Sequence, residues 1–127
     1  MNYSSYNIIM TPWEIITNEK YDSWLQEQTE DDQAVIMGKV YLLEEYGPNL
    51  GRPHADTLKG SKIYSNLKEL RSKTDMHTFR VAYIFDPERK AVLLTGGDKK
   101  GKNQKKFYKD LIKEAEQVYS EYLKKRN

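Results

Sequence analysis

The side chains best suited to chemistry in this 127-residue chain are cations that follow one another through its second half. Lys68 and Arg71 lie in one expected strand, and Arg80 lies in the next. Six lysines then occur in eleven residues, namely Lys99, Lys100, Lys102, Lys105, Lys106 and Lys109, with Phe107 and Tyr108 among them. Antiparallel strands bring such segments side by side, and converging cations beside an aromatic ring suit a phosphodiester backbone with a stacked base. The pattern favours contact with nucleic acid.

A structural explanation competes for part of this cluster. Lys105, Lys106 and Lys109 could form the solubilising start of a helix, although lysines there oppose the helix macrodipole and cost some stability. An arginine in a strand often pairs with a carboxylate or stacks on an aromatic ring. We therefore expect Arg71 to be functional and Arg80 to be mainly structural.

Several reaction classes need residues or motifs that this sequence lacks. It has no cysteine, which excludes a disulfide scaffold, a thiolate metal site and a cysteine nucleophile. Its two histidines, His54 and His77, lack metal-binding spacing, so we expect no metal and no cofactor. Neither a P-loop nor a Gly-x-Ser-x-Gly nucleophile motif occurs. The acidic pairs at 31–32 and 44–45 are most simply solvated helix faces.

Charge is divided unevenly along the chain, although the formal net charge is only +2. Residues 1–60 contain 4 Lys or Arg and 10 Asp or Glu, a net of −6, whereas residues 61–127 contain 17 and 9, a net of +8. This division indicates a polyanionic partner for the basic surface. No apolar run is long enough to span a membrane and residues 1–12 lack the features of a secretory signal, so we expect a soluble, cytoplasmic protein.

Apolar periodicity and turn residues predict one strand, two helices, three strands and a last helix. The expected strands are residues 13–16, 64–71, 77–85 and 91–95, and the expected helices are 19–28, about 29–46, and one that begins near residue 107. Residues 47–62 are predicted to be a loop, and Gly96-Gly97 is expected to end the sheet.

This order, β-α-α-β-β-β-α, is typical of the α+β class. We expect a single domain over residues 13–125, in which an N-terminal helical hairpin packs on a small, mostly antiparallel sheet. Residues 1–12 are predicted to be a flexible arm.

Four short motifs in sequence add a family resemblance. They are Gly51-Arg52-Pro53-His54 with Leu58-Lys59-Gly60, then Leu67-Lys68-Glu69-Leu70-Arg71, then Phe79-Arg80-Val81-Ala82-Tyr83, and finally Ala91-Val92-Leu93-Leu94 with Gly96-Gly97-Asp98-Lys99-Lys100. In this order they resemble toxins of the RelE/ParE superfamily, and within it the HigB-like branch. The resemblance implies a compact RelE-like α+β domain and the toxin of a bacterial type II toxin–antitoxin system.

Such toxins are small, metal-free endoribonucleases that usually cut mRNA in the ribosomal A site and so inhibit translation. The RNA supplies its own nucleophile, because the ribose 2′-OH attacks the adjacent phosphate and leaves a 2′,3′-cyclic phosphate. The implied partners are mRNA, the ribosome and a cognate antitoxin, expected to be a helix-turn-helix DNA-binding protein, with no membrane involved.

The resemblance also implies roles for individual residues. Arg71 matches the arginine that helps to hold the scissile phosphate, and Arg80 matches an arginine that is more often structural. The expected catalytic residues are Arg71, Lys99, Tyr108 and Lys68, and the expected RNA-binding residues are Lys100, Lys102, Lys59, His54 and Arg80. His54 is in addition the fallback base, since the unperturbed pKa of histidine lies near neutrality.

The chain departs from the HigB-like pattern at the end of its last strand. Many ribonucleases of this branch have a histidine there, whereas this sequence reads Thr95-Gly96-Gly97-Asp98. The general acid is therefore unassigned. Two alternatives stay open, a ParE-like inhibitor of DNA gyrase on the same fold and an inactive protein that only binds its antitoxin and co-represses transcription.

Overall fold

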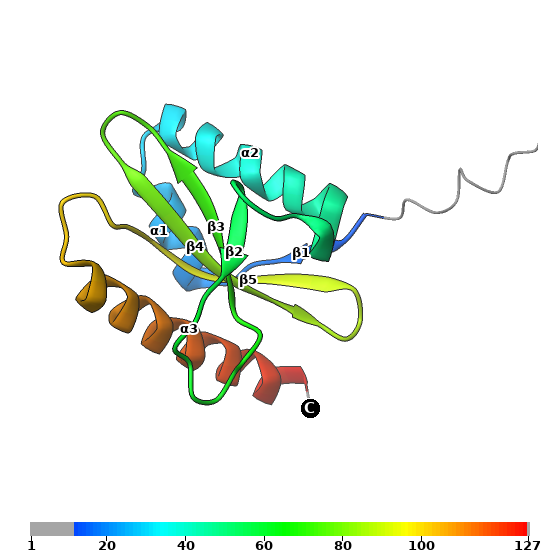
Figure 1. The fold of residues 1–127 in the computed structure, drawn as a ribbon. Helices are drawn as coiled ribbons and strands as arrows, with labels where there is room; N and C mark the ends of the chain where they lie inside the picture. Colours follow the sequence, from blue (N-terminus) through cyan, green and yellow to red (C-terminus); the bar gives the residue numbers. More distant parts are fainter. Residues whose placement is uncertain (1–11, 127) are drawn as a thin grey trace, which may run out of the picture.

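The computed structural model describes residues 12–126, and its centre is a five-stranded sheet with helices on both faces (Figure 1). The strand order is β1-β5-β4-β3-β2, in which β1 runs parallel to β5 and the other neighbours are antiparallel. The elements are β1 (Glu14–Ile16), α1 (Glu19–Gln26), α2 (Glu30–Tyr46), the 3-10 turn η2 (Gly47–Asn49), β2 (Ala55–Thr57), β3 (Lys68–Lys73), β4 (Thr78–Asp86), β5 (Lys90–Asp98) and α3 (Gln104–Arg126). The predicted α+β class is confirmed. Except for Pro12, the predicted N-terminal arm lies outside the described residues.

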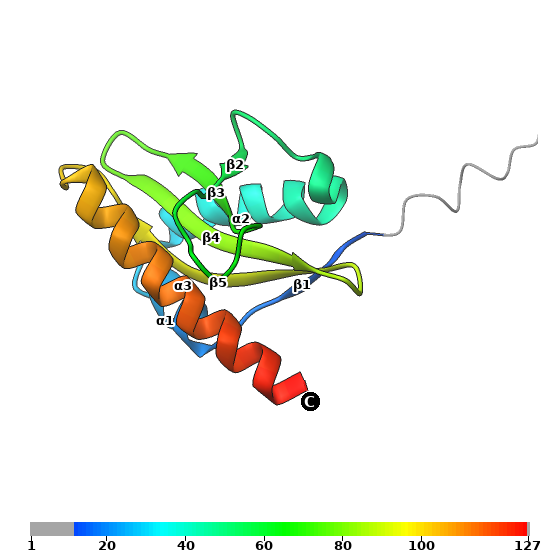
Figure 2. The ribbon, with the colours of Figure 1, turned by 60° about the horizontal axis from the view of Figure 1, so that its bottom comes forward.

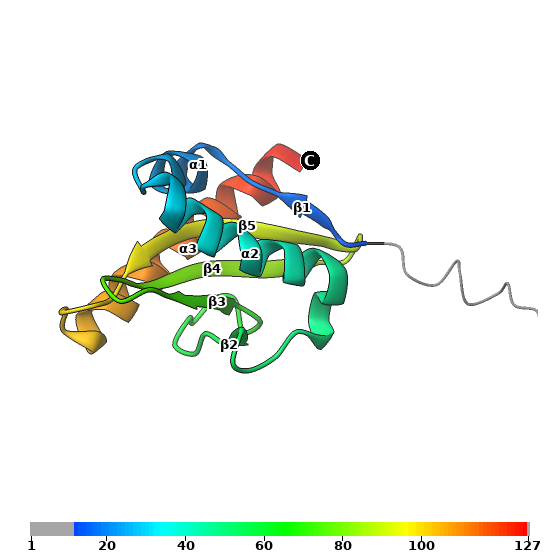
Figure 3. The ribbon, with the colours of Figure 1, turned by 90° about the horizontal axis from the view of Figure 1, so that it is seen from above.

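Side chains of the central strands alternate between two apolar cores. On β4, Phe79 and Val81 pack with residues of α1 and α2, whereas Ala82 and Ile84 pack with residues of α3. Because successive strand residues point to opposite faces, both faces of the sheet are covered. Figure 3 shows α2 over one face and α3 behind the other, and Figure 2 shows α3 crossing the strands obliquely. Within the described residues, no helix has the length and apolar character needed to cross a membrane.

Side-chain caps fix where the helices begin. The Asn18 side chain accepts a hydrogen bond from the backbone N–H of Tyr21 at 3.0 Å, and Asn103 accepts one from the N–H of Lys106, also at 3.0 Å. Each cap satisfies a backbone donor that has no partner inside its own helix. Since Asn103 follows β5 by only five residues, the first turn of α3 is held beside the end of the sheet.

The two N-terminal helices are present as predicted, but they do not fully match the predicted hairpin. Helix α1 packs on β5 and α2 packs on β3, so the sheet, rather than the other helix, is the main partner of each. Tyr21 of α1 and Ile36 of α2 are both buried in the core on this face of the sheet. The apolar stripe of each helix is therefore covered by strands, and the two helices lie side by side on one layer.

The predicted strand order is also incomplete. Residues 55–57, inside the segment predicted to be a loop, form the short strand β2, which pairs with β3. Strand β3 begins at Lys68 rather than at residue 64. Strand β5 continues through Gly96 and Gly97 to Asp98, although these glycines were expected to end the sheet. A Cβ on Gly96 would lie 2.5 Å from the Trp24 ring, so glycine here admits close packing against a continuing strand.

One buried carboxylate ties the turn after β4 to the C-terminal end of α3. Asp86 accepts hydrogen bonds from the Tyr122 hydroxyl and from the N–H of Glu88, both at 2.8 Å, and Arg126 Nη1 lies 3.3 Å from it. Burial by itself would raise the pKa of Asp86, but these donors and the positive charge of Arg126 hold that pKa below its usual value. The resulting stabilisation is present above the unfolded-state pKa of about 4 and is lost as the pH falls through the folded-state pKa.

We predict that Asp86→Asn lowers the free energy of unfolding by about 1–3 kcal/mol near neutral pH, because a buried charge-assisted network loses its acceptor. The variant should also lose less stability than the wild type between about pH 5 and pH 2, since its side chain does not titrate. Chemical denaturation at a series of pH values measures both effects. Glu88→Gln is the matched control, because its exposed side chain pairs with the same Arg126 at 3.1 Å and should matter little. An unchanged acid dependence in Asp86→Asn would contradict this role for Asp86.

Candidate functional site

Two arginines face each other directly across the central strands. Arg71 of β3 and Arg80 of β4 are cross-strand partners, an arrangement in which like charges repel. Glu69 lies on the same strand face as Arg71, two residues before it. Its Oε2 is 3.3 Å from Arg71 Nε, and its Oε1 is 3.7 Å from Arg80 Nε. Glu69 is only 4% exposed and Arg80 only 7%, so a buried carboxylate holds the two cations together.

The first turn of α3 and the end of β5 complete this cluster. Arg80 Nε donates a hydrogen bond to the Tyr108 hydroxyl at 3.2 Å, and Arg80 Nη1 donates one to the carbonyl of Phe79 at 2.9 Å. Lys99, the residue after β5, places its Nζ 5.4 Å from the centre of the Tyr108 ring. Residues from three strand segments and one helix therefore meet at one end of the sheet, and we call Glu69, Arg71, Arg80, Lys99 and Tyr108 the arginine cluster.

Burial and neighbouring charges change the acidity of two members of the cluster. Burial lowers the pKa of the Lys99 ammonium, and the positive charges of Arg80 and Arg71 lower it further, against an opposing effect of Glu69. Burial raises the pKa of the Tyr108 hydroxyl, and the negative charge of Glu69 adds to this rise although Arg80 opposes it. Lys99 therefore loses its proton more readily than an ordinary lysine, while Tyr108 stays protonated at neutral pH.

An open cleft of about 610 Å³ lies against the arginine cluster. Its lining residues are Val35, Lys39, Pro53, Arg71, Ser72, Lys73, Thr78, Arg80 and Lys99, which include five cations and no carboxylate. Strands β3 and β4 supply most of the wall, and α2 supplies Lys39. Such a surface can bind a polyanion and neutralise developing negative charge.

His54 lies at the Lys39 side of this cleft. Lys39 Nζ is 2.7 Å from His54 Nδ1. Because a lysine ammonium can only donate, Nδ1 is the acceptor and the ring proton belongs on Nε2. In this arrangement the imidazole offers a donor toward its surroundings, which suits binding of RNA better than the predicted role of fallback base.

The other predicted residues lie outside the cleft. Lys68 is on the face of β3 opposite to Arg71, because side chains alternate along a strand. The Lys100 ammonium donates to the backbone carbonyl of Asp75, next to the β3–β4 turn. Lys59 lies in the loop after β2, against α3.

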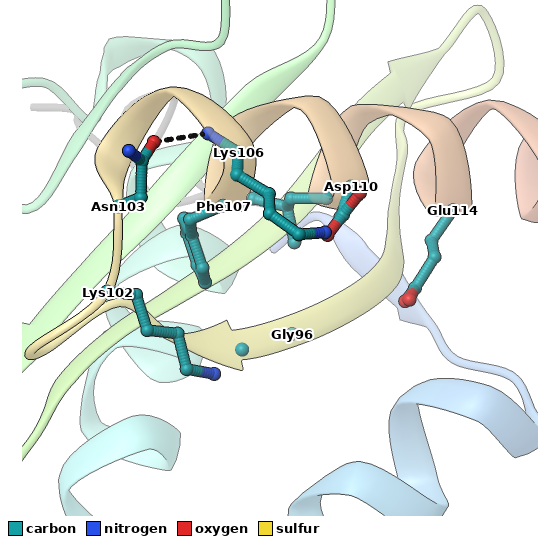
Figure 4. A pocket seen from close by; sticks show the side chains of 9 residues that line it. Gly96, Lys102, Asn103, Lys106, Phe107, Asp110 and Glu114 are labelled. Atoms are coloured by element: carbon teal, nitrogen blue, oxygen red, sulfur yellow. Dashed lines mark hydrogen bonds and ion pairs between the residues drawn. The ribbon is translucent and has the colours of Figure 1, made fainter.

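Lys102 belongs to a separate pocket of about 450 Å³ on a different side of α3 (Figure 4). Its Nζ is 6.0 Å from the centre of the Phe107 ring, and the nearby Lys106 is paired with Asp110 at 2.8 Å. Figure 4 shows this pocket between the end of β5, at Gly96, and the first turns of α3. The structure therefore divides the lysine-rich segment between two sides of the helix.

Sequence reasoning missed Glu69, Lys39 and Lys73. The spacing of Glu69 and Arg71 by two residues in a predicted strand already placed them on one face. The β3–β4 register, which pairs Glu69 with Ala82 and Arg71 with Arg80, makes Glu69 a diagonal neighbour of Arg80, and the local sequence does not reveal this register. For Lys39, a helical residue far away in sequence, no local signal points to the cleft.

The histidine that the HigB-like pattern led us to expect at the end of the last strand has no counterpart among the residues that line the cleft. His77 does reach this end of β5, where its Nδ1 is 2.6 Å from Asp98 Oδ2, but its ring stacks on Phe79 at 5.1 Å. Phe79 belongs to the core under α1 and α2, so His77 lies on the face opposite to Arg80. Among the described residues, no group of three or more His, Cys, Asp or Glu could hold a metal ion.

Comparison with known sequences shows the family. The family described as "Phage derived protein Gp49-like (DUF891)" matches residues 23–120. Two curated Mycobacterium tuberculosis proteins that carry the word toxin in their names are similar. HigB2 is 34% identical over 106 residues, which are 83% of this chain and 52% of that protein, and HigB3 is 38% identical over 109 residues, which are 86% and 92%. The chain thus spans about half the length of HigB2 and most of HigB3.

Solved structures agree with this in fold. The RelBE2 toxin–antitoxin complex of Mycobacterium tuberculosis gives a TM-score of 0.53 at 13% identity, covering 68% of this chain and 98% of that one. A mutant of the E. coli toxin RelE in the free state gives 0.53 at 11%, covering 90% and 97%, and the archaeal RelE–RelB complex of Pyrococcus horikoshii OT3 gives 0.52 at 19%, covering 72% and 99%. The predicted resemblance to HigB-like toxins is confirmed, and the chain belongs to the Gp49-like family, is similar to HigB2 and HigB3, and has a RelE-like fold.

Proposed function

We propose that this protein is the toxin of a type II toxin–antitoxin pair and that it cleaves mRNA in the cleft beside the arginine cluster. The observation that carries the proposal is the cleft lining, in which five cations and no carboxylate converge on one site. A ligand of this site must carry negative charge and must fit into an open cleft. A single-stranded phosphodiester does both.

Arg71 is the group that contacts the scissile phosphate in this proposal. Its side chain is 31% exposed, whereas that of Arg80 is only 9% exposed and is occupied by Tyr108 and the Phe79 carbonyl. The planar guanidinium of Arg71 can bind a phosphate through two donors, and Arg80 adds positive charge from behind. This division of roles agrees with the expectation that Arg71 is functional and Arg80 mainly structural.

The reaction is an attack of the ribose 2′-oxygen on the adjacent phosphorus. A bond from the 2′-oxygen to phosphorus forms, the bond from phosphorus to the 5′-oxygen breaks, and the products are a 2′,3′-cyclic phosphate and a free 5′-OH. The 2′-OH proton passes to solvent, and Lys99 donates a proton to the leaving 5′-oxygen. The lowered pKa of Lys99 favours this donation, while Tyr108, protonated at neutral pH, orients Arg80 and offers a surface to a base.

The same proposal includes an antitoxin partner. Two of the structural neighbours are toxin–antitoxin complexes, RelBE2 and archaeal RelE–RelB, and this likeness in fold supports a cognate antitoxin for this chain. A helix-turn-helix antitoxin, action on ribosome-bound mRNA and a cytoplasmic location belong to the proposal as well.

Arg71→Ala should abolish growth arrest on expression and reduce RNA cleavage by at least about 100-fold, because the transition state loses its phosphate ligand. Mapping of cellular RNA 5′ ends after regulated expression measures the cleavage. Arg52→Ala is the matched control, since Arg52 is an exposed arginine paired with Asp56 at 2.7 Å and is not part of the cleft lining. This control should remain as toxic as the wild type.

Two outcomes would count against the ribonuclease proposal. Growth arrest with intact mRNA, together with inhibition of gyrase supercoiling in vitro, would favour the gyrase alternative on the same fold. An absence of toxicity with retained binding of an antitoxin would favour the inactive co-repressor.

Glu69→Gln tests whether the buried carboxylate positions the site. Glu69 raises the pKa of Lys99, so its neutralisation should lower that pKa further. Because the proposed donor is the protonated lysine, the alkaline fall of the cleavage rate should move to lower pH, and the maximal rate should drop by about 10-fold as the arginines separate. A pH–rate profile for cleavage of ribosome-bound mRNA by the purified protein, measured well below the melting temperature of the protein, gives both results.

The control for this experiment is Glu114→Gln, a carboxylate of α3 that bonds to Thr95 outside the cleft. Its pH profile should match that of the wild type. A Glu69→Gln profile that falls in rate at every pH without moving would show that Glu69 only supports the fold.

A further inference from the structure

A second basic groove lies next to the cleft, between α3 and the loop at residues 59–64. Its volume is about 800 Å³, larger than that of the cleft. The lining residues are Lys59, Gly60, Lys62, Ile63, Gln104, Lys105, Tyr108, Lys109, Ile112, Lys113 and Glu116. We propose that this groove, which we call the lysine groove, binds the single-stranded RNA that flanks the scissile phosphate, an inference that rests on the proposed function.

Charge points to a polyanion as the occupant. Five lysines line the groove, and within residues 12–126 none of them forms an ion pair. The single lining carboxylate, Glu116, accepts a hydrogen bond from Ser61 at 2.7 Å. Asp110 of the same helix does not line the groove and is paired with Lys106, although its charge also interacts with Lys109 and Lys113. The five positive charges are therefore available to a ligand.

The lysines of α3 are arranged as a row. Lys105, Lys109 and Lys113 are spaced by four residues, so they lie on one face of the helix about 6 Å apart along its axis. Lys105 in the first turn opposes the macrodipole, and like charges four residues apart repel, so this row does not stabilise the helix itself. A row of cations along a groove follows the repeating phosphates of an extended strand.

Apolar side chains in the same groove suit bases. Ile63 is 61% exposed, although it is a large aliphatic residue, and Ile112 and Tyr108 lie across from it. Single-stranded RNA presents apolar base faces together with phosphates, whereas a purely electrostatic ligand would leave Ile63 in water.

The loop that forms one wall is held firmly in place. Ser61 bonds to Glu116, and the Tyr64 hydroxyl is 2.6 Å from the Ser120 hydroxyl. The Tyr64 ring also packs edge-on against Tyr119, with ring centres 4.9 Å apart. The lysine groove is therefore pre-formed and does not need to be assembled by its ligand.

Tyr108 connects the groove to the arginine cluster. Its ring lines the groove, and its hydroxyl accepts the hydrogen bond from Arg80. One RNA strand can therefore pass from the phosphate at Arg71, over Tyr108, into the row of lysines.

The test uses the whole protein and 2′-O-methyl oligonucleotides, which lack the attacking hydroxyl and cannot be cleaved. One probe has about eight nucleotides, comparable with the sites of single-strand-binding domains, and the other is a dinucleotide that the cleft alone can hold. Fluorescence anisotropy at several salt concentrations gives the affinities. The Lys109→Gln/Lys113→Gln variant should bind the long probe about 10-fold more weakly at low salt, and its salt slope should fall by about 1.4. Its affinity for the dinucleotide should not change.

Two further variants complete the test. Lys124→Gln/Lys125→Gln removes the same charge from the far end of α3, outside the groove, and should change the affinity for the long probe by less than about 2-fold. Ile63→Ala should weaken the long probe by about 3-fold with an unchanged salt slope, because it removes an apolar contact and no charge.

Equal binding of the long probe by the wild type and by Lys109→Gln/Lys113→Gln would overturn the inference. A wild-type affinity for an acidic peptide that exceeds its affinity for the long RNA probe, and that falls in the same variant, would also overturn the inference. A separate cleavage assay of the wild type distinguishes the two proposals. If the wild type cleaves no RNA but the Lys109→Gln/Lys113→Gln variant still binds the long probe more weakly, the ribonuclease function is contradicted and RNA binding by the lysine groove is supported.

Discussion

The site depends on one electrostatic arrangement, a buried carboxylate between two arginines that would otherwise repel. Arg71 and Arg80 oppose each other across β3 and β4, and Glu69 approaches both. Removing charges from water is costly unless they are paired, so the arrangement requires an accurate register between the two strands. A slip of one residue would turn Glu69 and Arg71 toward the apolar core under α2. The core packing that fixes this register therefore also fixes the chemistry.

The end of β5 supplies the second constraint. Gly96 lies against the Trp24 ring of α1, and a Cβ on Gly97 would lie 3.0 Å from the Phe107 ring of α3. Side chains at these positions would push both helices away from the strand. The two glycines thus let a layer close on each face of β5, and that closure brings Lys99 and the first turn of α3, with Tyr108, to the arginines. A pair of residues that sequence reasoning treats as a sheet terminator is instead what allows the site to assemble.

Local patterns predicted most of the elements, because caps, turns and apolar periodicity act within a few residues. Asn18 and Gly47-Pro48 indicated helix ends correctly, and the two-face coverage of residues 79–85 follows from apolar residues at successive positions. The short β2 has no apolar alternation of its own, and it exists only because β3 offers it a partner. The residues of the site likewise fall into those that local sequence can identify and those that only the tertiary structure brings together. Arg71 and Lys99 could be selected by type and motif, whereas the contributions of Glu69 and Lys39 depend on strand register and on a helix far away in sequence.

The arrangement also explains how this site could do without a histidine. A ribonuclease whose nucleophile is the substrate's own 2′-oxygen needs phosphate neutralisation and a proton donor, and neither must be an imidazole. Burial and the two arginines lower the pKa of Lys99, while Glu69 limits that fall, so the three charges that would position a phosphate in the proposed reaction also set the acidity of the proposed proton donor. The strand-end position at which the HigB-like pattern led us to expect a histidine holds Asp98 instead. Its carboxylate accepts hydrogen bonds from the N–H groups of Thr78 and Lys100, at 2.9 and 3.0 Å, and so ties the start of β4 and the residue after Lys99 to the end of β5.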